Sequence, residues 1–241
     1  PISVIPNPGL PPTPCDSYCT ILLLNLELNI WAKVLANCSI RVIPTLIHRD
    51  QAGFMPHRAT RHNIRRVYNA LALLLLHDSM GALLLVDFSK SFDSVDWTYL
   101  FELLVKMNFG PKFLQYVKIL YTNLIAHVRI GHVLSDSFPI RRGTGQGCPL
   151  FPLLFAIAIE QLANWIRGDA LIRGFEWDLG CHDDIAFYAD DILMFLGFHK
   201  ESGPRALQIL CLFGSYTGLT INLHKSVVYL LSGTDDKLEW A

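Results

Sequence analysis

The sequence predicts an α+β fold in which helices cover one face of an antiparallel sheet. Three observations support this prediction: short apolar runs typical of buried strands, longer breaker-free segments typical of helices, and turn signals between neighbouring strands. The chain has 241 residues, of which 51% are hydrophobic, enough for a sizeable core in one large domain or two small ones. No run reaches the ~18 uninterrupted apolar residues of a membrane span, so we expect no membrane partner.

The expected elements follow from local patterns along the chain. Residues 1–20 are proline-rich and are expected to be irregular. In the first helix Leu26, Ile30 and Val34 recur one turn apart. The expected helices are 25–38, 60–77 capped by Thr60, 97–107 capped by Asp96, 111–122 opened by Pro111, 150–166 opened by Pro149, and 204–218 closed by Gly214 or Gly218. The expected strands are 82–88, a hairpin turning at Gly131-His132, a hairpin turning at Asp190-Asp191, and 226–231.

Three aspartates lie at the ends of these expected strands. Asp190 and Asp191 are adjacent between the apolar runs of "IAFYADDILMF", and Asp87 follows the apolar run "ALLLV". Crowded carboxylates repel one another and lose hydration, so one of them usually protonates unless a cation neutralises them. Without His or Cys nearby, three carboxylates form a hard oxygen site that suits Mg²⁺. The alternative is a solvated turn, because Asp is common in turns.

The charges are balanced overall but unevenly distributed. The chain has 20 Lys+Arg and 21 Asp+Glu, which argues against a strongly basic nucleic-acid module. Residues 41–66 nevertheless contain six arginines and three histidines against the single acid Asp50. Such a segment could neutralise phosphates, or it could be a solvated surface. The six cysteines have no CxxC spacing, so we expect reduced thiols in an intracellular protein, nuclear or cytoplasmic.

Five segments, in order, resemble motifs of the reverse transcriptases of non-long-terminal-repeat retrotransposons, the long interspersed elements. They are "LIHRDQAGFMPHRATRHNIRRVYN" (46–69), "LLLVDFSKSFDSVDW" (83–97), "RRGTGQGCPLFPLLFAIAIE" (141–160), "FYADDILMF" (187–195) and "GLTINLHKSVVY" (218–229). The resemblance implies an RNA-directed DNA polymerase with a right-hand palm and partial fingers. It places partial fingers at 1–81 and 98–141 and the palm at 82–97 and 142–241. The sequence ends soon after these motifs and begins at Pro1, so we expect a missing thumb and a fragment of something longer.

The resemblance also implies a role for each site residue, with an RNA template, a DNA primer and deoxynucleotides as partners. The implied ligands of Mg²⁺ or Mn²⁺, which are also catalytic, are Asp87, Asp190 and Asp191. Lys225 would neutralise or protonate the leaving pyrophosphate. The implied nucleotide-binding residues are Phe92, which would exclude a ribose 2′-OH, and Gln146 and Gly147 in the glycine-rich loop. The implied contacts to template phosphates are Arg58, Arg61, Arg65 and Arg66.

The chain departs from the family pattern at the nucleotide site. Cys19 and Gly145 stand where the family usually has arginines, and each lost charge-assisted contact is worth ~1.5–3 kcal/mol. Phe151 replaces a small serine and is expected to crowd the start of its helix. The sequence therefore leaves catalytic activity open.

Three other functions were weighed against the polymerase. The first is an inactive retrotransposon remnant that at most binds nucleic acid. The second is a metal phosphohydrolase that uses the same carboxylates and His182. The third is RNA-templated RNA synthesis, against which Phe92 argues.

Overall fold

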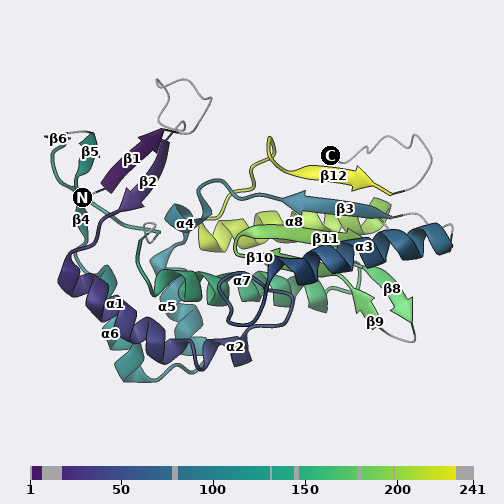
Figure 1. The fold of residues 1–241 in the computed structure, drawn as a ribbon, viewed down its shortest axis with the longest axis horizontal. Coiled ribbons are helices and arrows are strands. Elements are labelled where there is room, and N and C mark those ends of the chain that lie inside the picture. The colour runs from purple at the N-terminus through teal and green to yellow at the C-terminus, as the bar shows by residue number, and fades with distance from the viewer. Residues whose placement is uncertain are drawn as a thin grey trace. The chain divides into compact units, whose positions relative to one another are not determined.

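The structure is a computed structural model that describes residues 2–6, 18–77, 81–130, 132–143, 147–178, 181–197 and 199–231 (Figure 1). Its helices are α1 (Leu26–Ser39), α2 (Ile43–Leu46), α3 (Thr60–Leu76), α4 (Ser91–Ser94), α5 (Trp97–Lys106), α6 (Pro111–Tyr121), α7 (Phe151–Gly168) and α8 (His199–Thr217). Its strands are β1 (Ile2–Pro6), β2 (Tyr18–Leu22), β3 (Ala82–Val86), β4 (Ile125–Ala126), β5 (Val128–Ile130), β6 (Val133–Leu134), β7 (Phe138–Pro139), β8 (Phe175–Asp178), β9 (Cys181–Asp183), β10 (Ile185–Tyr188), β11 (Asp191–Leu196) and β12 (Val227–Leu230).

The chain forms two compact units. The first contains Pro1–Ser39 and Lys90–Leu154, and the second contains Ile40–Ser89 and Phe155–Ala241. The boundaries between fingers and palm that the sequence suggested stay a prediction. None of the described helices combines the length and the apolar character needed to cross a membrane.

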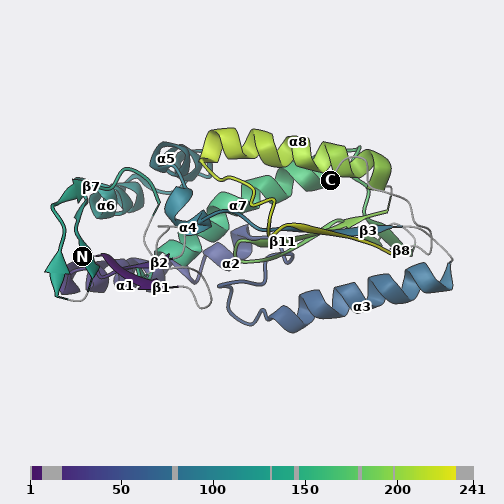
Figure 2. The same ribbon diagram turned by 90° about the horizontal axis from the view of Figure 1, so that it is seen from above.

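The second unit is built on a four-stranded sheet with the order β10-β11-β3-β12, in which every neighbouring pair is antiparallel. Helices α7 and α8 lie on one side of this sheet, as predicted, and α3 lies across the other side (Figure 2). The sequence did not anticipate the second layer. The predicted mixed fold with an antiparallel sheet is confirmed, with α3 as an addition.

The two faces of this sheet are distinguished by the alternation of side chains along each strand. Ala70 and Leu74 of α3 form a buried cluster with Leu83 and Phe195, which are cross-strand partners in β3 and β11. Odd-numbered residues of both strands therefore point toward α3. Not all of this face is covered, because Leu85 is 38% exposed and Tyr229 of β12 is 54% exposed. Asp87 and Asp191 continue the same odd-numbered series at the open end of the face.

In the first unit, strands replace a region that was expected to be irregular. β1 pairs with β2 in antiparallel register and with β5 in parallel register. The prediction of an irregular segment over residues 1–20 is wrong for these strands, because its proline-rich composition concealed the pairing of β1 with the nearby β2 and with β5, more than a hundred residues away. The predicted hairpin is confirmed as β5 and β6. Asp96 caps α5 as predicted, with its carboxylate accepting hydrogen bonds from the amides of Thr98 and Tyr99.

Three smaller expectations change. The residue that caps α3 is Ala59 rather than Thr60. Helix α8 begins five residues earlier than expected and is closed by Gly218, whose φ of +79° suits glycine. The hairpin of β8 and β9 was not predicted from the sequence.

Candidate active site

The hairpin of β10 and β11 presents the adjacent aspartates at its tip. Tyr188 pairs with Asp191 across the hairpin, so the two-residue turn is Ala189-Asp190 and Asp191 already belongs to β11. The expected turn at Asp190-Asp191 is therefore shifted by one residue. Ala189 has a φ of +59°, a conformation that costs a residue with a Cβ about 1–2 kcal/mol. Positive φ at only the first central residue is the pattern of a type II′ hairpin, where glycine is usual.

Asp87 lies beside this tip, on the next strand of the sheet. Ile192 pairs with Val86, so continuing the register by one residue sets Asp191 opposite Asp87. The backbone of Asp87 is fixed on its other side, since its amide donates to Ser226 Oγ at 3.2 Å and its carbonyl accepts from the amide of Asn222 at 2.8 Å. The aspartates are thus held by strands that the sequence separates by about a hundred residues.

One oxygen of Asp87 lacks a hydrogen bond in a place where water does not reach. Its Oδ2 is buried and accepts no hydrogen bond among the described residues. Among the described residues, Lys225 forms an ion pair with it, since its Nζ lies 3.7 Å away, which is too far for a hydrogen bond. The lysine side chain is 71% exposed, so this contact is weak.

The carboxylates of Asp87, Asp190 and Asp191 interact electrostatically. Partial burial of its carboxyl group, together with the charges of Asp190 and Asp87, raises the pKa of Asp191 above its ordinary value, and Lys225 lowers it by less. Desolvation and like charge both disfavour the ionised form. At Asp191, the repulsion from Asp190 and Asp87 and the loss of hydration therefore outweigh the attraction of Lys225.

This donor set fits a hard divalent cation by its chemistry. Carboxylate oxygens are the ligands of Mg²⁺, and a buried oxygen without a partner together with a crowded carboxyl group is what such an ion would stabilise. Across the part of the chain that the structure describes, no group of three or more His, Cys, Asp or Glu side chains is gathered into a metal-binding arrangement. The metal ligands therefore stay a prediction.

The predicted nucleotide-binding residues belong to the first unit or lie outside the description. Phe92 packs edge-to-face against Phe151, with ring centroids 5.7 Å apart. Phe151 is 3% exposed, so the large residue expected to crowd the start of α7 is accommodated in the core. Gly147 is exposed with a φ of +130°, whereas Gln146 and Gly145 lie outside the described residues. The backbone of Cys19 lies in β2, but its side chain is not described, and the same holds for His182 in β9.

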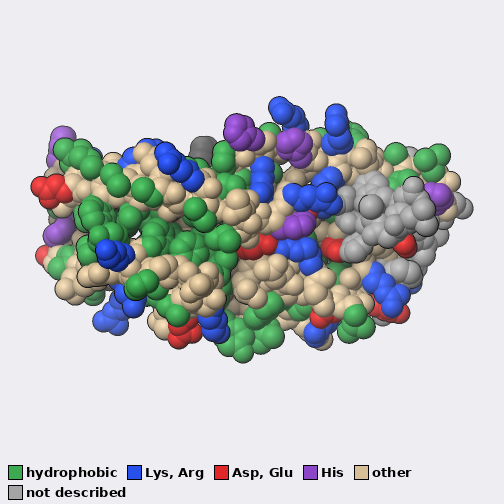
Figure 3. All heavy atoms as spheres, turned by 90° about the horizontal axis from the view of Figure 1, so that it is seen from below, with side chains coloured by type: hydrophobic (Ala, Val, Ile, Leu, Met, Phe, Trp, Pro, Cys, Tyr) green, Lys and Arg blue, Asp and Glu red, His purple; other side chains and the backbone are tan. Residues whose placement is uncertain are grey.

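The four arginines that were expected to contact template phosphates divide into two pairs. The guanidinium of Arg58 donates hydrogen bonds to the backbone carbonyls of Pro44, Ile47, His48 and Gln51. Arg66 donates to the carbonyl of Ile185 and pairs with Asp50. Arg61 and Arg65 are exposed one turn apart on α3, and neither has a hydrogen bond or ion pair within the described part of the chain. Figure 3 shows Lys, Arg and His side chains gathered at the upper middle of one face.

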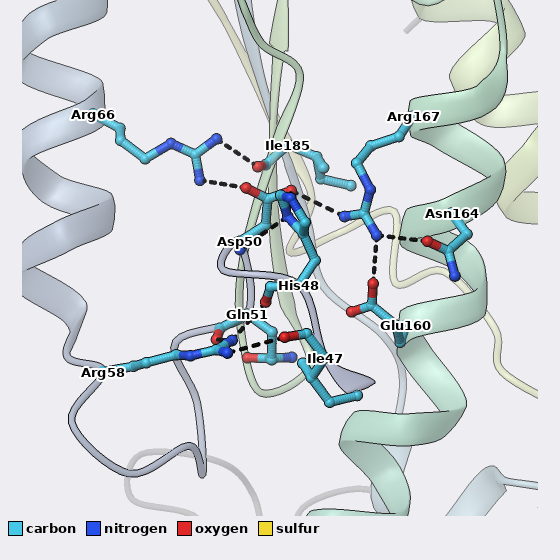
Figure 4. A network of polar contacts seen from close by, with 10 residues as sticks. All are labelled: Ile47, His48, Asp50, Gln51, Arg58, Arg66, Glu160, Asn164, Arg167 and Ile185. Carbon is cyan, nitrogen blue, oxygen red and sulfur yellow. Dashed lines mark hydrogen bonds and ion pairs between the residues drawn. The ribbon is translucent and has the colours of Figure 1, made fainter. Parts of the chain in front are cut away.

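Asp50, the single acid of segment 41–66, is the centre of an ion network (Figure 4). It is 5% exposed and contacts Arg167 at 2.9 Å, Arg66 at 3.2 Å and His48 at 2.8 Å. Arg167 on α7 also pairs with Glu160 and donates a hydrogen bond to Asn164. Burial raises the pKa of Glu160, and the guanidinium of Arg167 opposes that rise. We call these residues the Asp50 network: His48, Asp50, Arg66, Glu160, Asn164 and Arg167.

Two residues that were not predicted as site residues, Gln51 and Gly53, hold the aspartate turn. The side chain of Gln51 is 1% exposed, and its Oε1 accepts from the amide of Ala189 while its Nε2 donates to the carbonyl of Ala189. A Cβ on Gly53 would lie 2.2 Å from the amide nitrogen of Ala189, so only glycine fits there. The one available signal was the pattern "QAG" inside the basic segment, which has the polar, small residues of a close backbone approach.

Comparisons with known proteins agree with this architecture. The family model described as "Reverse transcriptase (RNA-dependent DNA polymerase)" matches residues 5–240. The transposon TX1 uncharacterized 149 kDa protein of Xenopus laevis is 33% identical over 61% of this chain and 11% of its own length. The Pol polyprotein from the type-1 retrotransposable element R2 of Popillia japonica is 24% identical over 58% of this chain and 23% of its own length. The resemblance to reverse transcriptases of non-long-terminal-repeat retrotransposons is thereby confirmed.

Solved structures share the fold. Telomerase from Candida tropicalis in complex with a fragment of telomeric RNA superposes with a TM-score of 0.70 at 14% identity, over 95% of this chain and 40% of that one. Telomerase from Candida albicans gives a TM-score of 0.56 at 12% identity, over 88% of this chain and 35% of that one. This chain therefore spans less than half of these structures and less than a quarter of the two retrotransposon relatives.

Proposed function

The chain belongs to the reverse transcriptase (RNA-dependent DNA polymerase) family, and we propose that it performs template-directed nucleotidyl transfer at Asp87, Asp190 and Asp191. The primer 3′-hydroxyl attacks the α-phosphate of a deoxynucleotide, a new phosphodiester bond forms, and the bond to pyrophosphate breaks. The observation that carries the proposal is the gathering of Asp87 and Asp191 on neighbouring strands, with Asp190 adjacent, where their mutual repulsion raises the pKa of Asp191 and the Oδ2 of Asp87 is buried.

In this proposal the three carboxylates hold divalent cations. Mg²⁺ or Mn²⁺ bound there would supply the positive charge that a phosphoryl transfer needs on its attacking and leaving oxygens. The chain contributes the fixed placement of the carboxylates. The amide of Asp87 is tied to Ser226 and the turn to Gln51, so the aspartates stay in place while substrates exchange.

Other residues receive their roles from the same proposal. Lys225 is exposed, lies beside Asp87 and can turn its ammonium group to the leaving pyrophosphate, which it would neutralise or protonate. Phe92 would exclude a ribose 2′-OH, and Gln146 and Gly147 would border the nucleotide. Arg61 and Arg65, exposed on α3, are the arginines placed to contact phosphates of an RNA template or DNA primer. Arg58 and Arg66 would act indirectly, by keeping the segment before α3 in place.

Primer extension tests the proposal. The purified chain is incubated with a DNA primer on an RNA template, deoxynucleotides and Mg²⁺ or Mn²⁺, beside the Asp190→Asn variant. We expect incorporation by the wild-type chain and a loss of about 10²–10³-fold or more in the variant, since loss of one major transition-state interaction costs about that order. Equal incorporation by both proteins would reject the assignment of Asp190. A folded wild-type chain that binds RNA without extending the primer would instead indicate a non-catalytic retrotransposon remnant.

A further inference from the structure

The turn that carries Asp190 is held by a part of the chain 138 residues earlier. Residues 50–52 run beside β10 like a short extra strand, with the amide of Ala52 donating to the carbonyl of Phe187 and the amide of Phe187 donating to the carbonyl of Asp50. This backbone pairing brings the side chain of Gln51 to the turn. The same segment supplies Gly53, against which the turn packs.

The side chain of Gln51 forms hydrogen bonds with both the amide and the carbonyl of Ala189, the strained residue of the turn. Its Oε1 accepts from the amide of Ala189 at 2.9 Å and from the amide of Gly53 at 2.8 Å. Its Nε2 donates to the carbonyl of Ala189 at 3.0 Å. Ala189 has the left-handed φ that a residue with a Cβ adopts at a cost, and such strain persists only where surrounding contacts determine the conformation.

The backbone conformation of Ala189 determines where the carboxylates of Asp190 and Asp191 point. Asp190 and Asp191 follow Ala189 directly, so a change in the φ or ψ of Ala189 rotates both carboxylates relative to Asp87. Gln51 itself is buried and touches the backbone of Ala189 rather than either aspartate. Removing its side-chain amide would leave the amides of Ala189 and Gly53 without their acceptor in a dry site, so the turn would lose the contacts that favour its strained conformation.

We infer that Gln51 is a positioning residue that locks the Ala189 turn in its strained conformation and so fixes Asp190 and Asp191 for the binding of divalent metal ions. This inference rests on the proposed polymerase function for its catalytic consequence, but the lock itself is a property of the fold. Outer residues that orient metal ligands typically change metal affinity about 10–100-fold when they are replaced.

The test uses Gln51→Met, which keeps the side-chain length but removes both hydrogen-bonding groups. The matched control is Ser202→Ala. Ser202 is 0% exposed, and its hydroxyl accepts from the amide of Arg173 and donates to the carbonyl of Leu171. Like Gln51, Ser202 is a buried side chain that hydrogen-bonds to backbone groups of a loop. Its loop lies at the opposite end of β11, where the amide of Gly197 donates to the carbonyl of Arg173.

Two readouts are compared, amide hydrogen exchange over residues 185–196 and the Mn²⁺ concentration that gives half-maximal primer extension. For Gln51→Met we expect exchange at Ala189 to Asp191 to accelerate at least about tenfold and the Mn²⁺ requirement to rise about 10–100-fold, with the KM for deoxynucleotide changed less. Ser202→Ala should alter neither. Unchanged exchange in Gln51→Met, or an equal effect in Ser202→Ala, would overturn the inference.

The wild-type chain supplies a check that needs no variant. Its Ala189 amide should exchange slowly although it lies in a surface turn, because its acceptor is a buried side chain. Fast exchange there would overturn the inference even if Gln51→Met failed to fold. If the wild-type chain extends no primer, the polymerase proposal fails, while amide exchange still decides whether Gln51 holds the turn.

Discussion

Two carboxylate groups of the second unit differ in how completely their charges are neutralised. In the Asp50 network, Asp50 faces two arginines and a histidine within 3.2 Å and is almost fully buried. Beside the hairpin tip, Asp87 pairs with Lys225, an exposed residue whose ammonium group lies 3.7 Å away. The charge of Asp50 is thus matched by three close cationic or hydrogen-bonding partners, whereas the ion pair of Asp87 with Lys225 is long and exposed to solvent. Satisfaction of charge, rather than the presence of charge, therefore distinguishes a structural ion network from a candidate active site.

The largest expected effect on stability comes from removing the central carboxylate of the Asp50 network. Asp50→Ala leaves Arg66 and Arg167 without their shared partner, and removing one member of a buried ion network costs about 3–5 kcal/mol of the free energy of unfolding. Urea denaturation measures this loss. Asp190→Asn serves as the comparison, because Asp190 lies in a hairpin turn and is only partly buried, and substitutions at such positions usually change the free energy of unfolding by less than about 1 kcal/mol. If both variants unfold at the same urea concentration, the two groups do not differ as described.

A second prediction concerns the arginines of segment 41–66. Replacing both Arg61 and Arg65 by Gln should weaken RNA binding and reduce the slope of log K against log salt by about 1.4, since each phosphate contact to a single strand contributes about 0.7. Arg58→Gln should leave that slope unchanged and lower the free energy of unfolding, because its guanidinium serves four backbone carbonyls. Fluorescence anisotropy with labelled RNA across a salt series measures the slope. A reduced slope in Arg58→Gln would mean that this arginine also contacts phosphate.

The smallest expected effect on the free energy of unfolding comes from Asp191 at the hairpin tip. The pKa of Asp191 is raised in the folded chain, so the folded state holds this proton more tightly than the unfolded state. The free energy of unfolding therefore falls as the pH rises from the ordinary value of 3.8 through the raised pKa, and the penalty is complete above it. Asp191→Asn should stabilise the chain at pH 7, by less than about 1 kcal/mol because the residue is exposed, and should give no gain below pH 3.8. Thermal unfolding in a chelator at several pH values checks the sign, and a variant destabilised at pH 7 would contradict it.

The features that could be predicted from the sequence are those that depend on residues close together in the chain. Period and caps located the helices, including the Asp96 cap of α5, and the family motifs pointed to the aspartates. The partners of individual side chains could not be predicted in this way. Arg58 and Arg61 look alike in the sequence, but one turns inward to backbone carbonyls that the loop before α3 leaves free, and the other stays in solvent. Gln51 contacts a turn 138 residues away, a pairing that no local pattern encodes. The same limit applies to the pairing of β1 with the distant β5, whereas its pairing with the nearby β2 was missed because the segment is rich in proline.

The central claim is our proposal that Asp87, Asp190 and Asp191 bind a divalent cation, and thermal unfolding of the purified chain with increasing Mn²⁺ tests it most directly. A ligand that binds only the folded state stabilises it by about 2.7 kcal/mol at a hundred times its dissociation constant. We predict that Mn²⁺ raises the unfolding temperature of the wild-type chain and that Asp87→Asn abolishes this rise. An equal rise in both proteins, or no rise in the wild-type chain, would contradict the account.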